Sequence, residues 1–283
     1  MGFHTKPTTF IGHVKVKVEN LQRSIEFYRD VLGFDILEQT ASTVKLTTDG
    51  KTSFLSIEQP EGVMPKQGRT TGLYHFAILL PDQSSLANIV VHLVDKGIRF
   101  GSSDHLVSEA LYLHDPDGNE IEIYRDRSPI EWNWKGKEVE MAVDPLDFEH
   151  LLKIATPDKP WKRMPAEAVM GHIHLHVSEL NKTEEFYTKG LGMEVVNRFG
   201  TQALFLSYGK YHHHVGVNTW NGVGAPAPAK NSVGLESFTL IFDNEELRNQ
   251  TVINLKQVGA EVVEENNIMI TFDPSGNAIQ LAV

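Results

Sequence analysis

The chain has 283 residues, no cysteine and a formal net charge of −11. Its length is enough to bury the cores of about two domains, and the lack of cysteine excludes disulfide bonds and thiolate metal sites. The acidic balance, without a dense cluster of Lys and Arg, argues against nucleic acid as a partner. No apolar stretch reaches the roughly 20 residues of a membrane span, and the first residues lack the layout of a secretory signal. We therefore expect a cytoplasmic protein with no membrane partner.

The first predicted elements are one strand, one helix and three short strands. Alternation predicts a strand over 13–18, and apolar residues at helical spacing predict a helix that opens at Asn20 and stops at Gly33. Three short alternating strands follow, near 35–39, 43–48 and 53–58. The order strand, helix and three strands defines one unit.

The same order of elements begins again at LYHFAILL (73–80). This strand precedes a helix from Ser84 to Lys96, with Gly97 as its stop. Three further strands are predicted near 98–101, 109–114 and 120–125. The first part of the chain thus contains two copies of the unit.

The second part of the chain repeats the first. GHVKVKVENLQRSIEFYRDVLGF (12–34) matches GHIHLHVSELNKTEEFYTKGLGM (171–193), and DPDGNEIEI (115–123) matches DPSGNAIQL (273–281). GLYHF (72–76) matches GLESF (234–238) at nearly the same spacing. Such self-similarity indicates a tandem duplication.

The duplication predicts an α+β fold of four tandem βαβββ units in two domains, with curved, mostly antiparallel sheets that form two cups. We place the N-terminal domain at 9–126 and the C-terminal domain at 168–283. The segment 127–167 has no counterpart and is interpreted as a connector.

Strand alternation assigns side chains to the two faces of each sheet. Ile121 and Ile123 should pack under a helix, which leaves Glu122 on the opposite face. By the same alternation Tyr112 lies on the polar face of its strand, and His13 and His75 begin corresponding strands of the two units. A polar face that carries His, Glu and Tyr is expected to line a cup.

His13, His75 and Glu122 form the candidate metal site of the first half. Two imidazoles and one carboxylate leave open coordination positions and suit Fe(II), Mn(II) or Zn(II). Each residue alone would more often be a satisfied core histidine or a solvated strand residue. Their joint occurrence at corresponding points of a duplicated unit favours a metal, and it predicts that this half does the chemistry.

The second half lacks this set, because Ser237 and Gln280 stand at the second and third positions. His172 remains at the first position, and YHHHV supplies three more histidines. Either His172, His212 and His214 form a second, non-catalytic metal site, or these histidines form a hydrogen-bonded cluster.

GHVKVKV, FYRDVLGF, GLYHFAIL, SEALYLHDPDGNEIEIY and YHHHVGVNTWNG together resemble the vicinal oxygen chelate superfamily. Within it the chain is similar to bacterial two-domain catechol 2,3-dioxygenases, the type I extradiol enzymes. This resemblance implies Fe(II) on His13, His75 and Glu122, with His105 as the acid–base residue and Tyr112 as a hydrogen-bond donor to a catecholate oxygen. It also implies a small aromatic diol and O₂ as substrates, and it leaves a homo-oligomer open. In the better-known members the second half carries the iron, so the assignment is reversed here.

Two other functions stay open at this point. One is a metal-dependent lyase, isomerase or thiol transferase of the glyoxalase kind, for which Glu58 is the candidate fourth ligand. The other is a binding protein that sequesters a small aromatic drug without metal. Fold alone does not choose among them.

Overall fold

The computed structural model describes residues 2–156 and 160–283. Every repeat folds as one strand, one helix and further strands, in the predicted order. The first repeat contains β1 (Phe10–Lys17), α1 (Leu21–Glu26), the π-helical η1 (Phe27–Leu32), β2 (Asp35–Gln39), β3 (Thr43–Thr47) and β4 (Ser53–Glu58). The second contains β5 (Gly72–Leu79), α2 (Gln83–Asp95), β6 (Gly101–Asp104), β7 (Ser108–His114) and β8 (Glu120–Asp126).

The second half follows the same plan. The third repeat contains β11 (Val169–His176), α4 (Leu180–Glu185), η3 (Phe186–Gly190), β12 (Glu194–Phe199), β13 (Ala203–Ser207) and β14 (Val215–Asn218). The fourth contains β15 (Gly234–Ile241), α5 (Glu245–Gln257), β16 (Val262–Glu265), β17 (Ile268–Phe272) and β18 (Ala278–Ala282). The connector contains η2 (Pro129–Glu131), β9 (Trp134–Lys135), β10 (Glu138–Val139) and α3 (Phe148–Ile154). Residues 157–159 of the expected connector lie outside the described part.

The helix boundaries follow from capping residues. The side chain of Asn20 accepts a hydrogen bond from the backbone N–H of Arg23 and so begins α1. Gly33 ends η1 with a φ of 88°, a left-handed conformation that glycine adopts without strain. Asp82 begins α2 in the same way, through the N–H of Ser85. The predicted start at Asn20 and stop at Gly33 are therefore confirmed.

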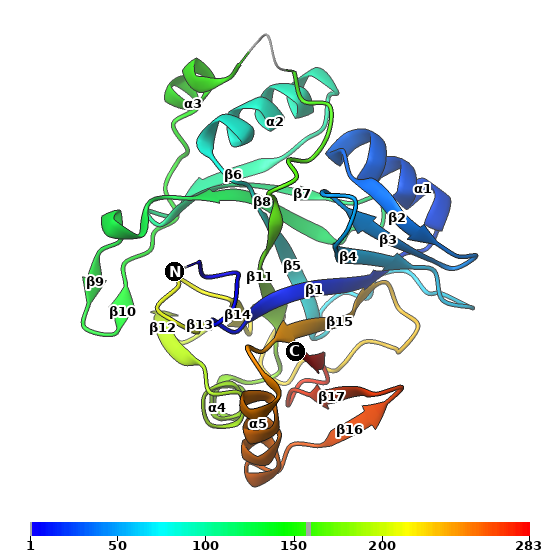
Figure 1. Ribbon diagram of the computed structural model, residues 1–283, viewed down its shortest axis with the longest axis vertical. Helices are drawn as coiled ribbons and strands as arrows, with labels where there is room; N and C mark the ends of the chain where they lie inside the picture. Colours follow the sequence, from blue (N-terminus) through cyan, green and yellow to red (C-terminus); the bar gives the residue numbers. More distant parts are fainter. Residues whose placement is uncertain (1, 157–159) are drawn as a thin grey trace.

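Apart from β9 and β10, which pair with each other, the strands form two eight-stranded sheets, each of which combines repeats from both halves (Figure 1). Sheet 1 has the order β16-β17-β18-β15-β1-β4-β3-β2, and sheet 2 has the order β12-β13-β14-β11-β5-β8-β7-β6. At the centre of sheet 1, β1 pairs with β15; at the centre of sheet 2, β11 pairs with β5. Both central pairs are antiparallel.

The expectation that the N-terminal domain 9–126 closes its own cup is therefore wrong, and the same holds for 168–283. The first repeat shares a sheet with the fourth, and the second shares a sheet with the third. The physical reason is that alternation fixes which face of a strand is buried but not which edge it pairs with. The α+β class, the curved sheets and the four repeated units are confirmed.

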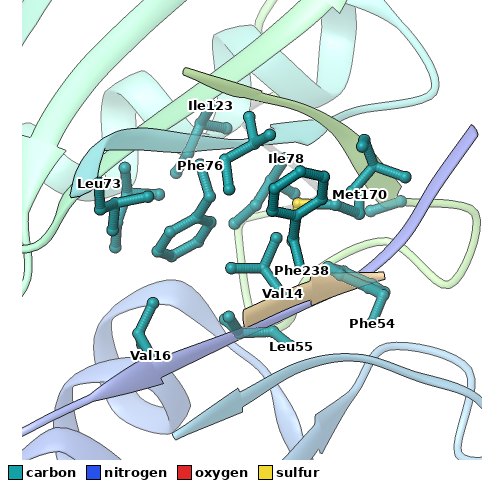
Figure 2. Close-up of a cluster of buried hydrophobic side chains, with 14 of the residues drawn as sticks. Val14, Val16, Phe54, Leu55, Leu73, Phe76, Ile78, Ile123, Met170 and Phe238 are labelled. Atoms are coloured by element: carbon teal, nitrogen blue, oxygen red, sulfur yellow. The ribbon is translucent and has the colours of Figure 1, made fainter. Parts of the chain in front are cut away.

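The core joins the two sheets. Val14 of β1 and Phe238 of β15 meet Phe76 of β5 and Met170 of β11 in one buried cluster (Figure 2). Val14, Phe76 and Phe238 are fully buried, and the burial of large apolar side chains is the main stabilising term of such a fold. The polar faces of the sheets consequently point away from this cluster. Among the described residues, no helix is long and apolar enough to cross a membrane.

Candidate metal centre

Three neighbouring strands of sheet 2 bring together two histidines and one glutamate. His172 on β11 lies opposite Ala77 on β5, and Ala77 in turn pairs with Glu122 on β8. His75 lies two residues before Ala77 on β5, so its side chain is on the same face. His75, Glu122 and His172 therefore all project from the polar face of one sheet.

The three side chains converge on a point. Nε2 of His75 and Nε2 of His172 each lie 3.0 Å from Oε2 of Glu122. One ligand atom from each of the three residues lies within 4.8 Å of the other two. All three side chains are buried. Two imidazole nitrogens thus approach the same carboxylate oxygen in a site shielded from bulk water.

The hydrogen bonding of these groups is incomplete. The 3.0 Å contact between His75 Nε2 and Glu122 lacks the geometry of a hydrogen bond. Neither ring nitrogen of His75 therefore has a hydrogen-bond partner among the residues that the structure describes, and Nδ1 of His172 has none either. Leaving a buried polar atom unpartnered costs about 1–3 kcal/mol, so such atoms need an explanation. A divalent cation would use nitrogen lone pairs that hydrogen bonds leave free, and the two-imidazole, one-carboxylate donor set fits Fe(II). The residues present therefore fit the metal that the resemblance implies.

Electrostatics holds the groups in the protonation states that a metal requires. Burial alone would raise the pKa of Glu122, but the adjacent His172 and His75 outweigh it and hold the pKa well below its usual range. Burial lowers the pKa of His172 to about 4, against the opposing effect of Glu122. An ionised carboxylate and a neutral imidazole are the ligand forms of these residues.

A cavity of about 460 Å³ opens beside this cluster, and two of its members, His75 and Glu122, line it. Phe205, Trp220 and Met141 contribute apolar walls, and Met141 comes from the connector. None of the described residues that line this cavity is Lys or Arg. Its size and its apolar character suit a small, uncharged aromatic ligand.

Tyr112 and His105 stand together at the wall of this cavity. Oη of Tyr112 lies 2.6 Å from Nε2 of His105, whose Nδ1 lies 2.7 Å from the backbone oxygen of Ala142. The carbonyl can only accept, so Nδ1 of His105 donates and its Nε2 accepts from Tyr112. Burial, followed by the charge of Glu122, raises the pKa of Tyr112 well above its usual value. The structure thus brings both predicted catalytic residues to the cavity, and their roles stay proposals.

His13 does not belong to this constellation, which corrects the predicted ligand set. It lies on β1 in sheet 1, where its Nε2 is 2.8 Å from Oγ of Ser56. There His13 lies opposite Thr239 of β15, as His172 lies opposite Ala77. The repeat makes β1 and β11 equivalent in sequence, and the structure selects β11 as the partner of β5.

Of the two alternatives for the histidines of the second half, the structure favours the hydrogen-bonded cluster over a second metal site. His172 belongs to the cluster with His75 and Glu122, which is the one group of three potential ligands within the described ranges. His212 instead lies 2.8 Å from Oδ1 of Asp126, and Nε2 of His214 lies 3.0 Å from the backbone oxygen of Phe3. His212 and His214 thus belong to a hydrogen-bonded cluster.

Glu58, the fourth ligand of the glyoxalase-type alternative, is also remote from the cluster. It ends β4 in sheet 1 and forms an ion pair with Lys15. The sheet assignment therefore removes the donor on which a four-ligand site in sheet 2 would have depended.

His213 is a cavity residue that the sequence did not single out within its triplet. It lines the cavity, and its ring centroid lies 4.1 Å from that of His172. Burial, followed by the neighbouring His172 and His212, lowers its pKa well below the usual value. The presence of the triplet in YHHHVGVNTWNG, one of the segments that resemble the superfamily, was the signal that could have identified it.

Comparison with known proteins follows the same division into repeats. Residues 10–123 and 169–281 match the family described as Glyoxalase/Bleomycin resistance protein/Dioxygenase superfamily. The catechol-2,3-dioxygenase of Bacillus subtilis (strain 168) is 41% identical over 274 residues, which are 95% of this chain and 95% of that protein.

Solved structures share the fold at low identity. A crystal structure from Bacillus subtilis subsp. subtilis str. 168 has a TM-score of 0.67 at 16% identity and covers 98% of this chain and 86% of the other. Glyoxalase I from Zea mays has a TM-score of 0.60 at 17% identity, with 97% and 92% covered. At these identities the structures bear on the fold alone.

Proposed function

The chain belongs to the glyoxalase/bleomycin resistance protein/dioxygenase superfamily and is an oxygenase enzyme, and on this premise we propose that it is an extradiol dioxygenase. Its substrates would be O₂ and catechol or a substituted catechol, and its metal would be Fe(II). The observation that carries the proposal is the convergence of His75, Glu122 and His172 in one cluster, two members of which, His75 and Glu122, line the cavity. Mn(II) and Zn(II) fit the same donors, so metal identity is part of the test.

His75, Glu122 and His172 would hold the metal on one face, since all three project from the same side of sheet 2. A bound Fe(II) would supply the open coordination positions and the redox chemistry that a reaction of a diol with O₂ requires. The single carboxylate gives the ligand set one negative charge, so that the loaded site keeps a net positive charge for an anionic diol.

The cavity residues would bind the ring and handle its protons. His213 can accept a hydroxyl proton of the diol at a ring nitrogen, because burial keeps its imidazole neutral. The hydrogen of Tyr112 Oη points to Nε2 of His105, so Tyr112 can accept a second proton while it passes its own to His105. The predicted acid–base role of His105 would thus be exerted through Tyr112.

The apolar walls would orient the ring and exclude water. Phe205 and Trp220 line the cavity, and no Lys or Arg of the described part of the chain lines it with them. A carboxylate on the ring would therefore be desolvated without a partner, which is costly. We infer a preference for uncharged catechols. Cytoplasmic location, self-association, and the absence of nucleic-acid and membrane partners stay predictions.

The test is anaerobic loading with Fe(II), followed by catechol and air, with detection of the yellow ring-opened semialdehyde. His172→Ala and His13→Ala form a matched pair, because the two histidines occupy equivalent places in the two sheets. We expect His172→Ala to lose iron and turnover and His13→Ala to keep both. Turnover of wild type with Zn(II) but not Fe(II), or ring cleavage by His172→Ala, would contradict the proposal.

A further inference from the structure

We propose that Asp126 and His212 fix the ring of His213 in the tautomer whose Nε2 carries no hydrogen and is free to face the substrate. The inference rests on the proposed function, because it concerns how His213 accepts a proton from a diol. His213 is the group that would touch the substrate. Asp126 and His212 act through it and are positioning residues.

The three side chains form a continuous chain of hydrogen bonds from the surface to the cavity. Oδ1 of Asp126 lies 2.8 Å from Nε2 of His212, and Nδ1 of His212 lies 2.8 Å from Nδ1 of His213. The side chain of Asp126 is 20% exposed and that of His212 is 0% exposed, whereas His213 lines the cavity. The middle residue therefore has no alternative partner in solvent.

The chemistry of each atom assigns the hydrogens along this chain. A carboxylate only accepts, so Nε2 of His212 carries the hydrogen of the bond to Asp126. In the proposed arrangement His212 carries a single ring hydrogen, the one on Nε2, so its Nδ1 accepts from Nδ1 of His213. The one ring hydrogen of neutral His213 is thereby used, and its Nε2 keeps a free lone pair. A proton acceptor needs this lone pair on the nitrogen that is not tied to His212.

Buried neighbours hold Asp126 in place. Tyr211 Oη donates to Oδ1 of Asp126 at 3.3 Å, and Tyr124 Oη lies 2.6 Å from Tyr211 Oη. The Tyr124 hydroxyl fits only because residue 171 is glycine: a Cβ at Gly171 would lie 2.0 Å from it. The carboxylate is thus held by the buried Tyr211, which precedes β14 and is itself held by Tyr124 of β8, rather than by a mobile surface contact.

The other sheet supplies an internal comparison. When β4 on β1 is aligned with β14 on β11 by strand register, Thr52 and Ser53 occupy the places of His212 and His213. Sheet 1 also lacks the complete ligand set, with Ser237 where sheet 2 has His75. The imidazole pair therefore accompanies the ligand set within this molecule, which a purely structural pair would not require.

The experiment measures the tautomer directly and turnover separately. Selective ¹⁵N-histidine labelling distinguishes protonated from unprotonated ring nitrogens. The protein is loaded with Zn(II), because this ion is diamagnetic and does not broaden the signals. It is measured at pH 8, where histidines of ordinary pKa are neutral. We expect wild-type His213 to show a protonated Nδ1 and an unprotonated Nε2. Asp126→Ala and His212→Phe should mix the two tautomers of His213.

In Fe(II)-loaded protein the same variants should lose about 10–100-fold in kcat, as supporting hydrogen-bond partners often do, with iron content and KM within threefold of wild type. His214→Phe is the matched control, since it removes a buried imidazole of the same triplet whose Nε2 lies 3.0 Å from the backbone oxygen of Phe3 and which takes no part in the chain to His213; its kcat should stay within threefold. A protonated Nε2 in wild-type His213, or undiminished kcat in both Asp126→Ala and His212→Phe, would overturn the inference. If wild type fails to cleave catechol, the proposed function fails, and the ¹⁵N result still decides the tautomer.

Discussion

Ser237→His together with Gln280→Glu should build a second metal site in sheet 1, beside His13. The register supports this design, because His13 lies opposite Thr239 and Thr239 pairs with Gln280. Residue 237 lies two positions before Thr239 on the same face of β15. The new histidine at 237 and the new glutamate at 280 would therefore be placed relative to His13 as His75 and Glu122 are placed relative to His172 in sheet 2.

The magnitude follows from the contacts that must be exchanged. Metal binding requires His13 to leave its 2.8 Å bond to Ser56, which costs about 1 kcal/mol net. Thr239 occupies the position that Ala77 has in sheet 2. Its Oγ1 donates to Oε1 of Gln280 at 3.2 Å, so Gln280→Glu alters that hydrogen bond too. We expect the metal-free double variant to be about 1–3 kcal/mol less stable than wild type. Free metal at 100 times Kd contributes about 2.7 kcal/mol, or a rise in Tm of roughly 5–10 °C.

The assay combines metal analysis with thermal unfolding. The double variant should bind about one more equivalent of Zn(II) than wild type. Adding Thr239→Ala should raise the Zn(II) affinity of the new site, because it removes the hydroxyl and methyl groups that Ala77 lacks in sheet 2. His13→Ala in the double-variant background should abolish the extra equivalent and spare the original one. If even the variant with Thr239→Ala binds no additional metal, the two polar faces are not equivalent in geometry and the register argument fails.

Three further predictions test other parts of the structure. His105→Ala should keep iron and lose about 10²–10⁴-fold in kcat; a kcat per iron within threefold of wild type would remove His105 and its bond to Tyr112 from the mechanism. Tyr28→Phe removes a buried hydrogen bond of 3.1 Å to Asp115 and should lower the free energy of unfolding by about 1–3 kcal/mol in urea titration, with an unchanged value as the contrary result. The kcat/KM of catechol should exceed that of carboxylated catechols by at least ~100-fold, because the described cavity lining has no Lys or Arg. Val143→Arg should reduce this ratio, and equal kcat/KM values in wild type would contradict the reasoning.

Local pattern was sufficient for the units and their faces. Alternation predicted that Ile121 and Ile123 are buried, and both are 0% exposed. The same alternation placed His75 and Glu122 on the polar face, where the structure brings them within contact distance. These features depend on the period of the sequence alone, which is why a single sequence is enough to reveal them.

Strand partnership was beyond the reach of local pattern. His13 and His172 begin equivalent strands in equivalent sequence contexts, so either could have completed a site with His75. The choice depends on long-range pairing of edges with similar apolar residues, and no local propensity encodes it. The sequence did not identify His213 as a site residue for a related reason. Residues 212–214 precede β14 and are not in a strand, so alternation does not apply to them.

The exchange of repeats between the sheets would make a bound metal a tether between the two halves of the chain. His75 and Glu122 belong to one half and His172 to the other, so a bound ion would cross-link segments that a cut in the connector would separate. Fragments on either side of such a cut would each carry an incomplete sheet and an incomplete ligand set. Reassembly would then be bimolecular, and metal affinity would depend on fragment concentration, because the ion can bind fully only where the two pieces meet.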